Sequence, residues 1–142
     1  MKRAVEHSAM LAAFLAVCEG SGLSHLVLLA IWYHETNGGK SALWRDAINP
    51  AGIKFATGFF ITTPWGKASN GRDARYPNRS IAAAALVLFL RQKRYSKAWG
   101  AIDTDQVREI GQAGFVEHGG IEPGNWISGV TRWLEFVRKE KP

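Results

Sequence analysis

An uninterrupted run of eight apolar residues, Leu26 to Tyr33, constrains the fold of this chain more than any other feature of its sequence. A helix over this run is apolar on every side, and such a helix is stable only where other parts of the chain surround it. The run is much shorter than the roughly 20 apolar residues that span a bilayer. The sequence therefore predicts a fold built around one buried helix over residues 23–36, which ends at Asn37-Gly38-Gly39.

Several other segments have apolar residues at helical spacing. Ser41 and Ser80 are expected to cap two of these helices. Residues 53–76 combine strand-forming residues with turn residues, and they predict a small β-hairpin or ordered loop. We expect residues 1–142 to form a single, mainly α-helical domain. The predicted elements are helices over 4–18, 41–47, 81–92 and 126–139, a helical turn over 95–99, a helix capped by Asp103 or Thr104 that ends at Gly114, and a loop over 116–125.

The balance of charged residues indicates an anionic partner. Eighteen basic and twelve acidic residues give a net charge of +6, which suits nucleic acid, an acidic membrane face or an acidic wall polymer. The basic cluster over residues 91–97 could bind phosphate, but cations at the end of a helix also complement its dipole, and we favour that interpretation. No nucleic-acid partner and no stable membrane insertion are expected.

Metal and disulfide chemistry are not expected from this sequence. Cys18 is the single cysteine, so it can form neither an intramolecular disulfide nor a cysteine-based zinc site. The four histidines lack metal-ligand spacing, since His34-Glu35 is followed by glycine at position 38 and does not complete H-E-x-x-H. We therefore predict no metal and no other cofactor.

The first apolar segment has two possible interpretations. Lys2 and Arg3 precede it, as in a signal peptide, but no small-x-small cleavage site follows. Its apolar residues also share one helical face, so we interpret it as the first helix of the fold. On this interpretation the protein is made in the cytoplasm without an export signal of its own.

Glu35 is the strongest candidate for a catalytic residue. It follows the buried helical run and precedes a glycine-rich turn, so its carboxyl lies at the end of a buried helix beside a loop. Apolar surroundings and the negative end of the helix dipole both favour the protonated form. A carboxyl that stays protonated near neutral pH can act as general acid on a glycosidic bond. Alternatively, Glu35 caps a loop amide or pairs with Lys40 or Arg45.

Five segments, in order, resemble the bacterial glucosaminidases of glycoside hydrolase family 73. Residues 28–43 (LLAIWYHETNGGKSAL) are similar to the family's L-A-Q-A-A-L-E-S-G-W-G-x-S. The later segments are 49–54 (NPAGIK, compared with N-x-F-G-I-K), 74–78 (ARYPN, compared with F-R-x-Y-x-S), 89–98 (FL and RYSKA, compared with F-L-x(n)-R-Y-x-x-A) and 113–115 (AGF, compared with A-G-Y).

The resemblance implies a lysozyme-like helical fold and hydrolysis of the β-1,4 bond that follows N-acetylglucosamine in peptidoglycan. Glu35 matches the family's acid, and Tyr76 matches a tyrosine that lines its cleft and could hold a water. Phe115 takes the place of a second family tyrosine. Gly38 stands where the family has tryptophan, and residues 117–123 replace its short A-T-D-P.

A second carboxylate, which relatives of this family carry in the hairpin, is missing over residues 53–72. Asp73 is the nearest candidate for a base, and its alternative role is a turn residue paired with Arg72 or Arg75. An inverting enzyme needs a base about 6.5–9.5 Å from the acid, and a retaining enzyme needs a nucleophile about 5–5.5 Å away. If Asp73 does not serve, the substrate's own 2-acetamido oxygen can attack, and we favour this substrate-assisted route.

Several residues are expected to bind the glycan. Asn49 and the turn Gly52-Ile53-Lys54 are expected to form the floor of the cleft, with close backbone approach or a positive φ at the glycine. Phe59, Phe60, Trp65 and Tyr76 are candidates for stacking on sugar rings, because aromatic faces pack against the C–H faces of sugars. Phe115, in the place of a family tyrosine, is also expected to bind the substrate.

Three alternatives stay open at the level of sequence. The same fold could act as a muramidase or as a lytic transglycosylase, and a basic helical module could instead bind nucleic acid or a protein. A wall hydrolase without an export signal fits a phage endolysin released through a membrane pore or an antibacterial effector exported by a secretion machine, acting in the periplasm or cell wall. An effector would have a cognate immunity protein, acidic and blocking the cleft.

Overall fold

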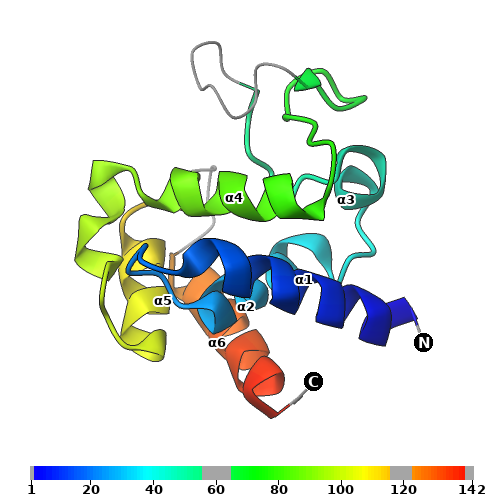
Figure 1. Cartoon of the computed structure of the whole chain (residues 1–142). Coiled ribbons are helices and arrows are strands. Elements are labelled where there is room, and N and C mark those ends of the chain that lie inside the picture. Colours follow the sequence, from blue (N-terminus) through cyan, green and yellow to red (C-terminus); the bar gives the residue numbers. More distant parts are fainter. Residues whose placement is uncertain (1, 56–64, 116–122, 140–142) are drawn as a thin grey trace.

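A computed structural model of the protein describes residues 2–55, 65–115 and 123–139. The protein is mainly α-helical, as predicted. Figure 1 shows its helices packed across one another, with both described ends of the chain on the surface. Its elements are α1 (Lys2–Cys18), α2 (His25–Thr36), α3 (Ala42–Ala47), α4 (Arg79–Leu90), the 3-10 helix η2 (Lys93–Ala98), α5 (Asp103–Gln112) and α6 (Pro123–Lys139).

Helix α2 is the buried centre of the fold. Every residue from Val27 to Tyr33 is at most 1% exposed. Helices α1 and α6 both pack against α2, and α4 packs against α1, with α1 and α4 side by side in Figure 1. The prediction of one central helix surrounded by the rest of the chain is confirmed, because only full enclosure removes every side of this run from water.

Polar side chains at the helix starts explain most of the observed boundaries. Ser24 Oγ accepts a hydrogen bond from the Val27 amide at the start of α2, and Ser41 caps α3 as predicted. The cap predicted at Ser80 is wrong, because Asn78 accepts from the Ile81 amide and α4 begins at Arg79. An asparagine oxygen satisfies the same free amides of a first turn that a serine would.

The two C-terminal helices also differ from expectation at their starts. No side chain caps α5, which begins at Asp103 after Ile102 in extended conformation. Helix α6 begins at Pro123, three residues before the predicted start, so the predicted loop over 116–125 ends too late. Proline is well suited to a first helical position because the amide it lacks has no partner there. Residues 116–122 lie outside the described part of the chain.

The described residues between α3 and α4 form an ordered loop. Two isolated antiparallel bridges join Lys54 to Asp73 and Lys67 to Ala74. Figure 1 shows the segment projecting from the helical body beside α3. Of the two forms predicted for residues 53–76, the described residues show the ordered loop; residues 56–64 are not among them.

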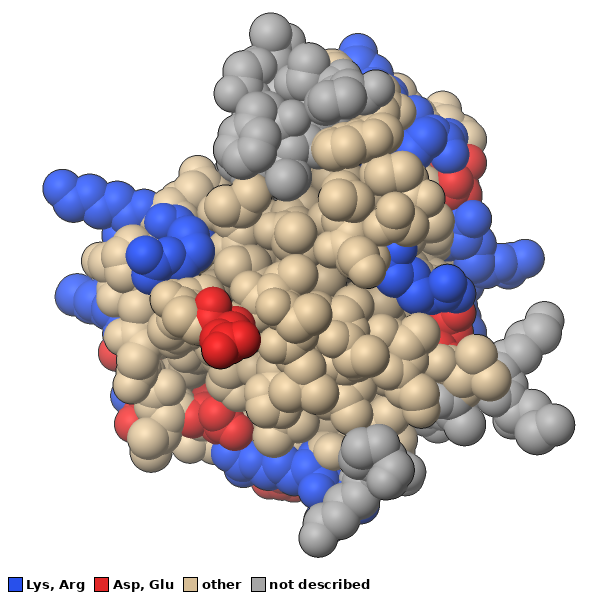
Figure 2. All heavy atoms as spheres, viewed as in Figure 1, with Lys and Arg blue, Asp and Glu red and all other residues tan. Residues whose placement is uncertain are grey.

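Charge is unevenly distributed on the surface. Figure 2 shows few charged side chains at the centre of the face over α1 and α4, and lysines and arginines around its edge. Residues 8–18 of α1 and 80–90 of α4 include no Asp, Glu, Lys or Arg, which accounts for the uncharged centre. Among the helices that the structure describes, none is both long enough and apolar enough to span a bilayer.

Candidate functional site

Glu35 lies in the last turn of α2, at the edge of the core. The preceding Tyr33 is fully buried, whereas Glu35 is half-buried. The helix ends at the next residue, Thr36, and Asn37 after it adopts a left-handed conformation and donates its amide to the Tyr33 carbonyl. Burial raises the pKa of the Glu35 carboxyl, as predicted from its position. The side chain therefore combines a favoured protonated form with partial access to solvent.

Trp126 of α6 holds this carboxyl. Its indole Nε1–H donates to Glu35 Oε2 at 2.9 Å. This hydrogen bond lowers the pKa of Glu35, but burial has the larger effect and the net direction is upward. Among the described residues, neither of the alternative partners, Lys40 and Arg45, forms a hydrogen bond or ion pair with Glu35, and both are exposed. The indole is therefore the polar partner of this acid.

Two glycines allow α6 to reach the end of α2. A Cβ atom on Gly129 would lie 2.5 Å from Cε1 of His34, the residue before Glu35. A Cβ atom on Gly111 of α5 would lie 2.5 Å from Cγ1 of Ile127 and 3.1 Å from Cε3 of Trp126. Real Cβ atoms do not approach so closely, so the two helix crossings depend on glycine at these positions.

Phe115 and Trp126 connect Glu35 to a row of aromatic rings. The Phe115 ring lies 5.1 Å from Trp126 and 5.7 Å from Phe89, measured between centroids. Phe89 in turn lies 5.8 Å from Tyr95. Phe115 and Phe89 are half-buried, so part of each ring remains exposed. The structure thus places Phe115, predicted as a binding residue, next to the tryptophan that holds Glu35.

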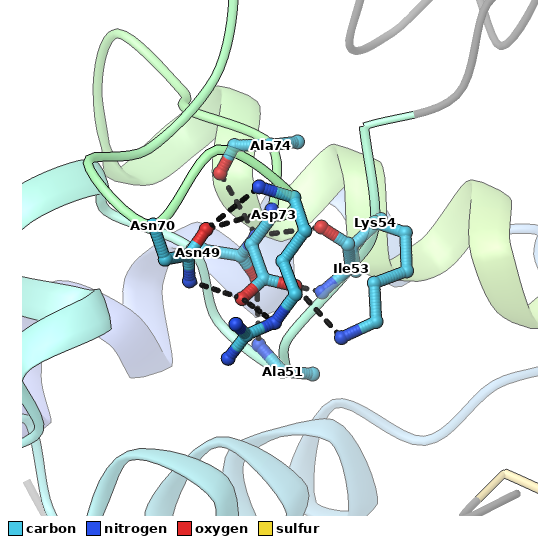
Figure 3. Close-up of polar contacts among 8 residues, drawn as sticks. Asn49, Ala51, Ile53, Lys54, Asn70, Asp73 and Ala74 are labelled. Atoms are coloured by element: carbon cyan, nitrogen blue, oxygen red, sulfur yellow. Dashed lines mark hydrogen bonds and ion pairs between the residues drawn. The ribbon is translucent and has the colours of Figure 1, made fainter.

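Asn49 organises the loop after α3 (Figure 3). Its Nδ2 donates to the carbonyls of Ile53 at 2.8 Å and Ala74 at 2.9 Å. Its Oδ1 accepts from the amides of Ala51 at 3.2 Å and Ile53 at 2.9 Å. The side chain is 1% exposed, and these four bonds use its hydrogen-bonding capacity. Asn49 therefore supports the loop from within, and its position does not favour the glycan contact predicted for it.

Asp73 is a buried, fully engaged carboxylate. Its Oδ1 accepts from Lys54 Nζ at 2.9 Å, and its Oδ2 accepts from Asn70 Nδ2 at 2.7 Å (Figure 3). Arg72 Nε is 4.0 Å from Oδ2, whereas Arg75 pairs with Asp46 instead. Asp73 is only 3% exposed and therefore has little access to a water that it could activate. The geometry favours a structural role for Asp73 over the catalytic role considered from sequence.

The remaining predicted binding residues are Gly52, Lys54, Trp65, Phe59 and Phe60. Gly52 has a φ of +65° with no atom within 4 Å of a built Cβ, so the predicted positive φ is confirmed and the predicted close backbone approach is absent. Lys54 has a half-exposed side chain that is paired with Asp73. Trp65 is half-buried and packs against the core. Phe59 and Phe60 lie outside the described residues.

Tyr76 belongs to the hydrophobic core. It is 1% exposed, and its hydroxyl is buried without a hydrogen-bond partner among the described residues. Burial raises the pKa of this phenol. A hydroxyl in this position cannot contact a substrate or hold a catalytic water, so its position does not support the predicted catalytic role. The sequence signal failed here because one tyrosine in a turn segment does not show which way its side chain points.

Trp126 is the site residue that sequence reasoning missed. It stands at the start of the predicted helix over 126–139, and it is 3% exposed. Its indole N–H reaches a residue 91 positions earlier in the chain. Buried tryptophans normally have a partner for this N–H, which is a general signal but does not identify the partner.

The described residues contain no group of three or more His, Cys, Asp or Glu side chains that could hold a metal ion. Comparison of the chain with protein-family models, with curated proteins and with solved structures gave no significant match.

Proposed function

We propose that this protein is a peptidoglycan hydrolase that cleaves β-1,4 glycosidic bonds as an endo-β-N-acetylglucosaminidase, with Glu35 as general acid. The observation that carries the proposal is the Glu35 carboxyl, whose pKa is raised by burial at the end of α2 and whose Oε2 is held by the Trp126 indole. A raised pKa is what a carboxylic acid needs in order to protonate a leaving sugar near neutral pH. The five resembling segments support the choice of substrate and a lysozyme-like arrangement of the helices.

In the proposed reaction Glu35 gives its proton to the glycosidic oxygen as the bond from C1 to that oxygen breaks. The 2-acetamido carbonyl oxygen of the same sugar attacks C1 and forms a cyclic oxazolinium intermediate. Water then adds to C1, reopens the ring, and returns one proton to the Glu35 carboxylate. The sum is one water consumed for each bond cleaved.

The engagement of Asp73 supports this substrate-assisted route. Both of its oxygens accept hydrogen bonds from side chains, Lys54 and Asn70. Using Asp73 as base would require it to give up these partners, and at 3% exposure the residue has little access to a catalytic water. A route that needs only one carboxyl therefore fits the described residues better than a route that needs two.

The basic cluster over 91–97 gives less support to a nucleic-acid-binding module. The Arg91 guanidinium lies 3.9 Å from the centroid of the Trp99 ring and donates to the Ser21 carbonyl at 2.9 Å. These contacts join η2 and its surroundings to the turn after α1. Arg91 thus contributes to the tertiary structure.

Digestion of purified peptidoglycan in a gel tests the proposal. We expect the wild type to clear the gel and Glu35→Gln to lose at least about 100-fold in rate, the lower end of what a general acid contributes. Glu19→Gln is the matched control, because it makes the same change at an exposed carboxyl after α1. Clearing by Glu35→Gln at the wild-type rate would refute the role of Glu35, and no clearing by the wild type would refute the activity.

Mass analysis of the released fragments distinguishes the enzyme classes. Reducing-end N-acetylglucosamine is expected for the proposed activity. Reducing-end N-acetylmuramic acid would show a muramidase instead, and 1,6-anhydro ends would show a lytic transglycosylase. Asp73→Asn tests the single-carboxyl route, since retained clearing supports it and loss of clearing by a folded variant would show that Asp73 takes part.

A further inference from the structure

We infer that Trp126 is a positioning residue for Glu35, and that its indole N–H confines the acidic proton to Oε1 by occupying Oε2. This inference rests on the proposed function, in which the proton on Glu35 is the one transferred to the leaving sugar. The indole does not need to touch the substrate. It acts through the carboxyl, by determining which of two chemically equivalent oxygens is the donor.

The chemistry of the two groups leads to this assignment. An indole N–H is a donor and never an acceptor, whereas in a protonated carboxyl the hydroxyl oxygen donates and the carbonyl oxygen is the stronger acceptor. A bond of 2.9 Å from Nε1 to Oε2 therefore favours Oε2 as the carbonyl oxygen. The hydroxyl proton is then favoured on Oε1. After proton transfer the same N–H still has a carboxylate oxygen to bind, so the bond persists through the reaction.

Contacts on several sides fix the orientation of the Trp126 indole, so that its N–H stays on Glu35 Oε2. Trp126 is 3% exposed, with Phe115 tilted against it at 5.1 Å and the His34 ring edge-on at 6.3 Å between centroids. Gly111 of α5 lies so close that a Cβ there would be 3.1 Å from Trp126 Cε3. Neighbours from α2, α5 and the segment after α5 thus restrict rotation of the ring and keep its N–H directed at Glu35.

A test of this contact must distinguish the titration of Glu35 from that of the other ionisable groups packed around α2. His34 adjoins Glu35 and contacts Trp126, and its pKa is lowered by burial and by Arg132 of α6. On α1, His7 Nδ1 is 2.6 Å from the Tyr33 hydroxyl. The buried face of α5 adds no ionisable group; it consists of Gln106, Val107, Ile110 and Gly111. His34 is therefore the group whose titration could be mistaken for that of Glu35.

Nuclear magnetic resonance of the indole tests the contact without any assay of activity. In uniformly ¹⁵N-labelled protein the Trp126 Nε1–H signal, identified by its absence from Trp126→Phe, should shift with pH as Glu35 ionises. The shift should vanish in Glu35→Gln, whose amide oxygen still accepts from the indole but does not ionise. A titration that persists in Glu35→Gln would assign the shift to His34 and overturn the inference, as would a signal that does not titrate in the wild type.

Kinetics test the positioning itself. Trp126→Phe should lower kcat about tenfold. Removing the hydrogen bond to the reacting carboxyl raises the activation barrier by about the free energy of one charge-assisted hydrogen bond. The alkaline limb of its pH profile should move to higher pH, because the lost N–H favoured the ionised carboxyl. Trp133→Phe makes the same change seven residues later on α6, where the ring stacks on Tyr33 at 4.8 Å, and should leave the limb in place.

The outcomes separate the two proposals. An unmoved alkaline limb in folded Trp126→Phe, or an equal movement in Trp133→Phe, would refute positioning by the indole while wall digestion stands. Failure of the wild type to digest peptidoglycan would refute the proposed function. The indole titration would then still decide, by itself, whether Trp126 and Glu35 are coupled in the folded protein.

Discussion

Two opposing effects act on the Glu35 carboxyl, and their balance determines what the residue can do. Burial raises its pKa and has the larger effect, whereas the hydrogen bond from Trp126 lowers it. Desolvation penalises the charged form, and a donor to the carboxylate stabilises that form. The residue therefore keeps a favoured proton together with a fixed orientation, which burial alone would not provide.

The raised pKa of Glu35 makes stability depend on pH. Because the folded state favours the protonated carboxyl, protonated Glu35 stabilises the folded protein. This contribution to the free energy of unfolding is complete below the unfolded-state pKa and is lost as pH rises through the folded-state pKa. Glutamine cannot ionise, so Glu35→Gln has no such loss. Thermal unfolding at a series of pH values should show Glu35→Gln gaining Tm over the wild type as pH rises through this range. A Tm difference independent of pH would contradict the expectation, and Glu19→Gln serves as the control.

The buried hydroxyl of Tyr76 should be dispensable. It has no hydrogen-bond partner among the described residues, and burying an unpaired hydroxyl costs about 1–3 kcal/mol. Urea denaturation should show Tyr76→Phe to be at least as stable as the wild type, with peptidoglycan digestion unchanged. Tyr33→Phe is the matched comparison, because it removes a hydroxyl 2.6 Å from His7 Nδ1 and should lose about 1 kcal/mol. Loss of digestion by folded Tyr76→Phe would restore the catalytic role predicted from sequence.

At the scale of elements, the crossing of α6 over α2 assembles the candidate site. Trp126 is in the first turn of α6 and Glu35 is in the last turn of α2. Gly129, one turn after Trp126, lies against the His34 ring with no room for a Cβ. The two helices can therefore approach closely enough for an indole on one to bond a carboxyl on the other.

Enlarging Gly129 should separate these helices. The new Cβ of Gly129→Ala would meet His34 Cε1 at 2.5 Å and Nδ1 at 2.9 Å, and such overpacking costs about 1–3 kcal/mol. Denaturation should show that loss, and digestion of peptidoglycan should fall because Trp126 is displaced with the helix. Gly124→Ala, on the same helix with open space around the position, should gain up to about 1 kcal/mol. Equal stability of the two variants would argue against a tight crossing.

At the scale of the whole molecule, the net charge favours association with an anionic partner such as the proposed wall substrate. The chain carries a net charge of +6, and Figure 2 shows lysines and arginines around the edge of the face over α1 and α4. Bacterial walls and their attached polymers are anionic, so attraction over a distance favours association of the protein with them. Such attraction is screened within about 10 Å at 0.1 M salt.

Binding to cell walls should therefore weaken as salt is added. Co-sedimentation of Glu35→Gln with purified walls measures binding without digestion, and the bound fraction should fall between about 0.05 M and 0.5 M sodium chloride as screening shortens. Walls stripped of their acidic polymers are the control and should show a smaller change. A bound fraction that does not respond to salt would show that contacts other than long-range charge dominate binding.

The spacing of apolar residues and the residues that start or stop helices were enough to predict the helices and the position of Glu35. An apolar run can only be buried, and a glycine-rich turn must end it, so Glu35 had to follow the core at the end of a central helix. Serine caps were confirmed at Ser41 and misplaced at Ser80, because Asn78 two residues earlier offers an equivalent oxygen. Signals of this kind act within a few residues and need no tertiary structure.

The partners of the polar side chains were decided only by the tertiary structure. Trp126 reaches Glu35 across 91 residues, and Asp73 pairs with Lys54 across a bridge between two loop segments. The side chain of Tyr76 turned into the core rather than toward solvent. These contacts depend on how closely helices cross and which way loops fold back, and those distances follow from packing the whole chain at once.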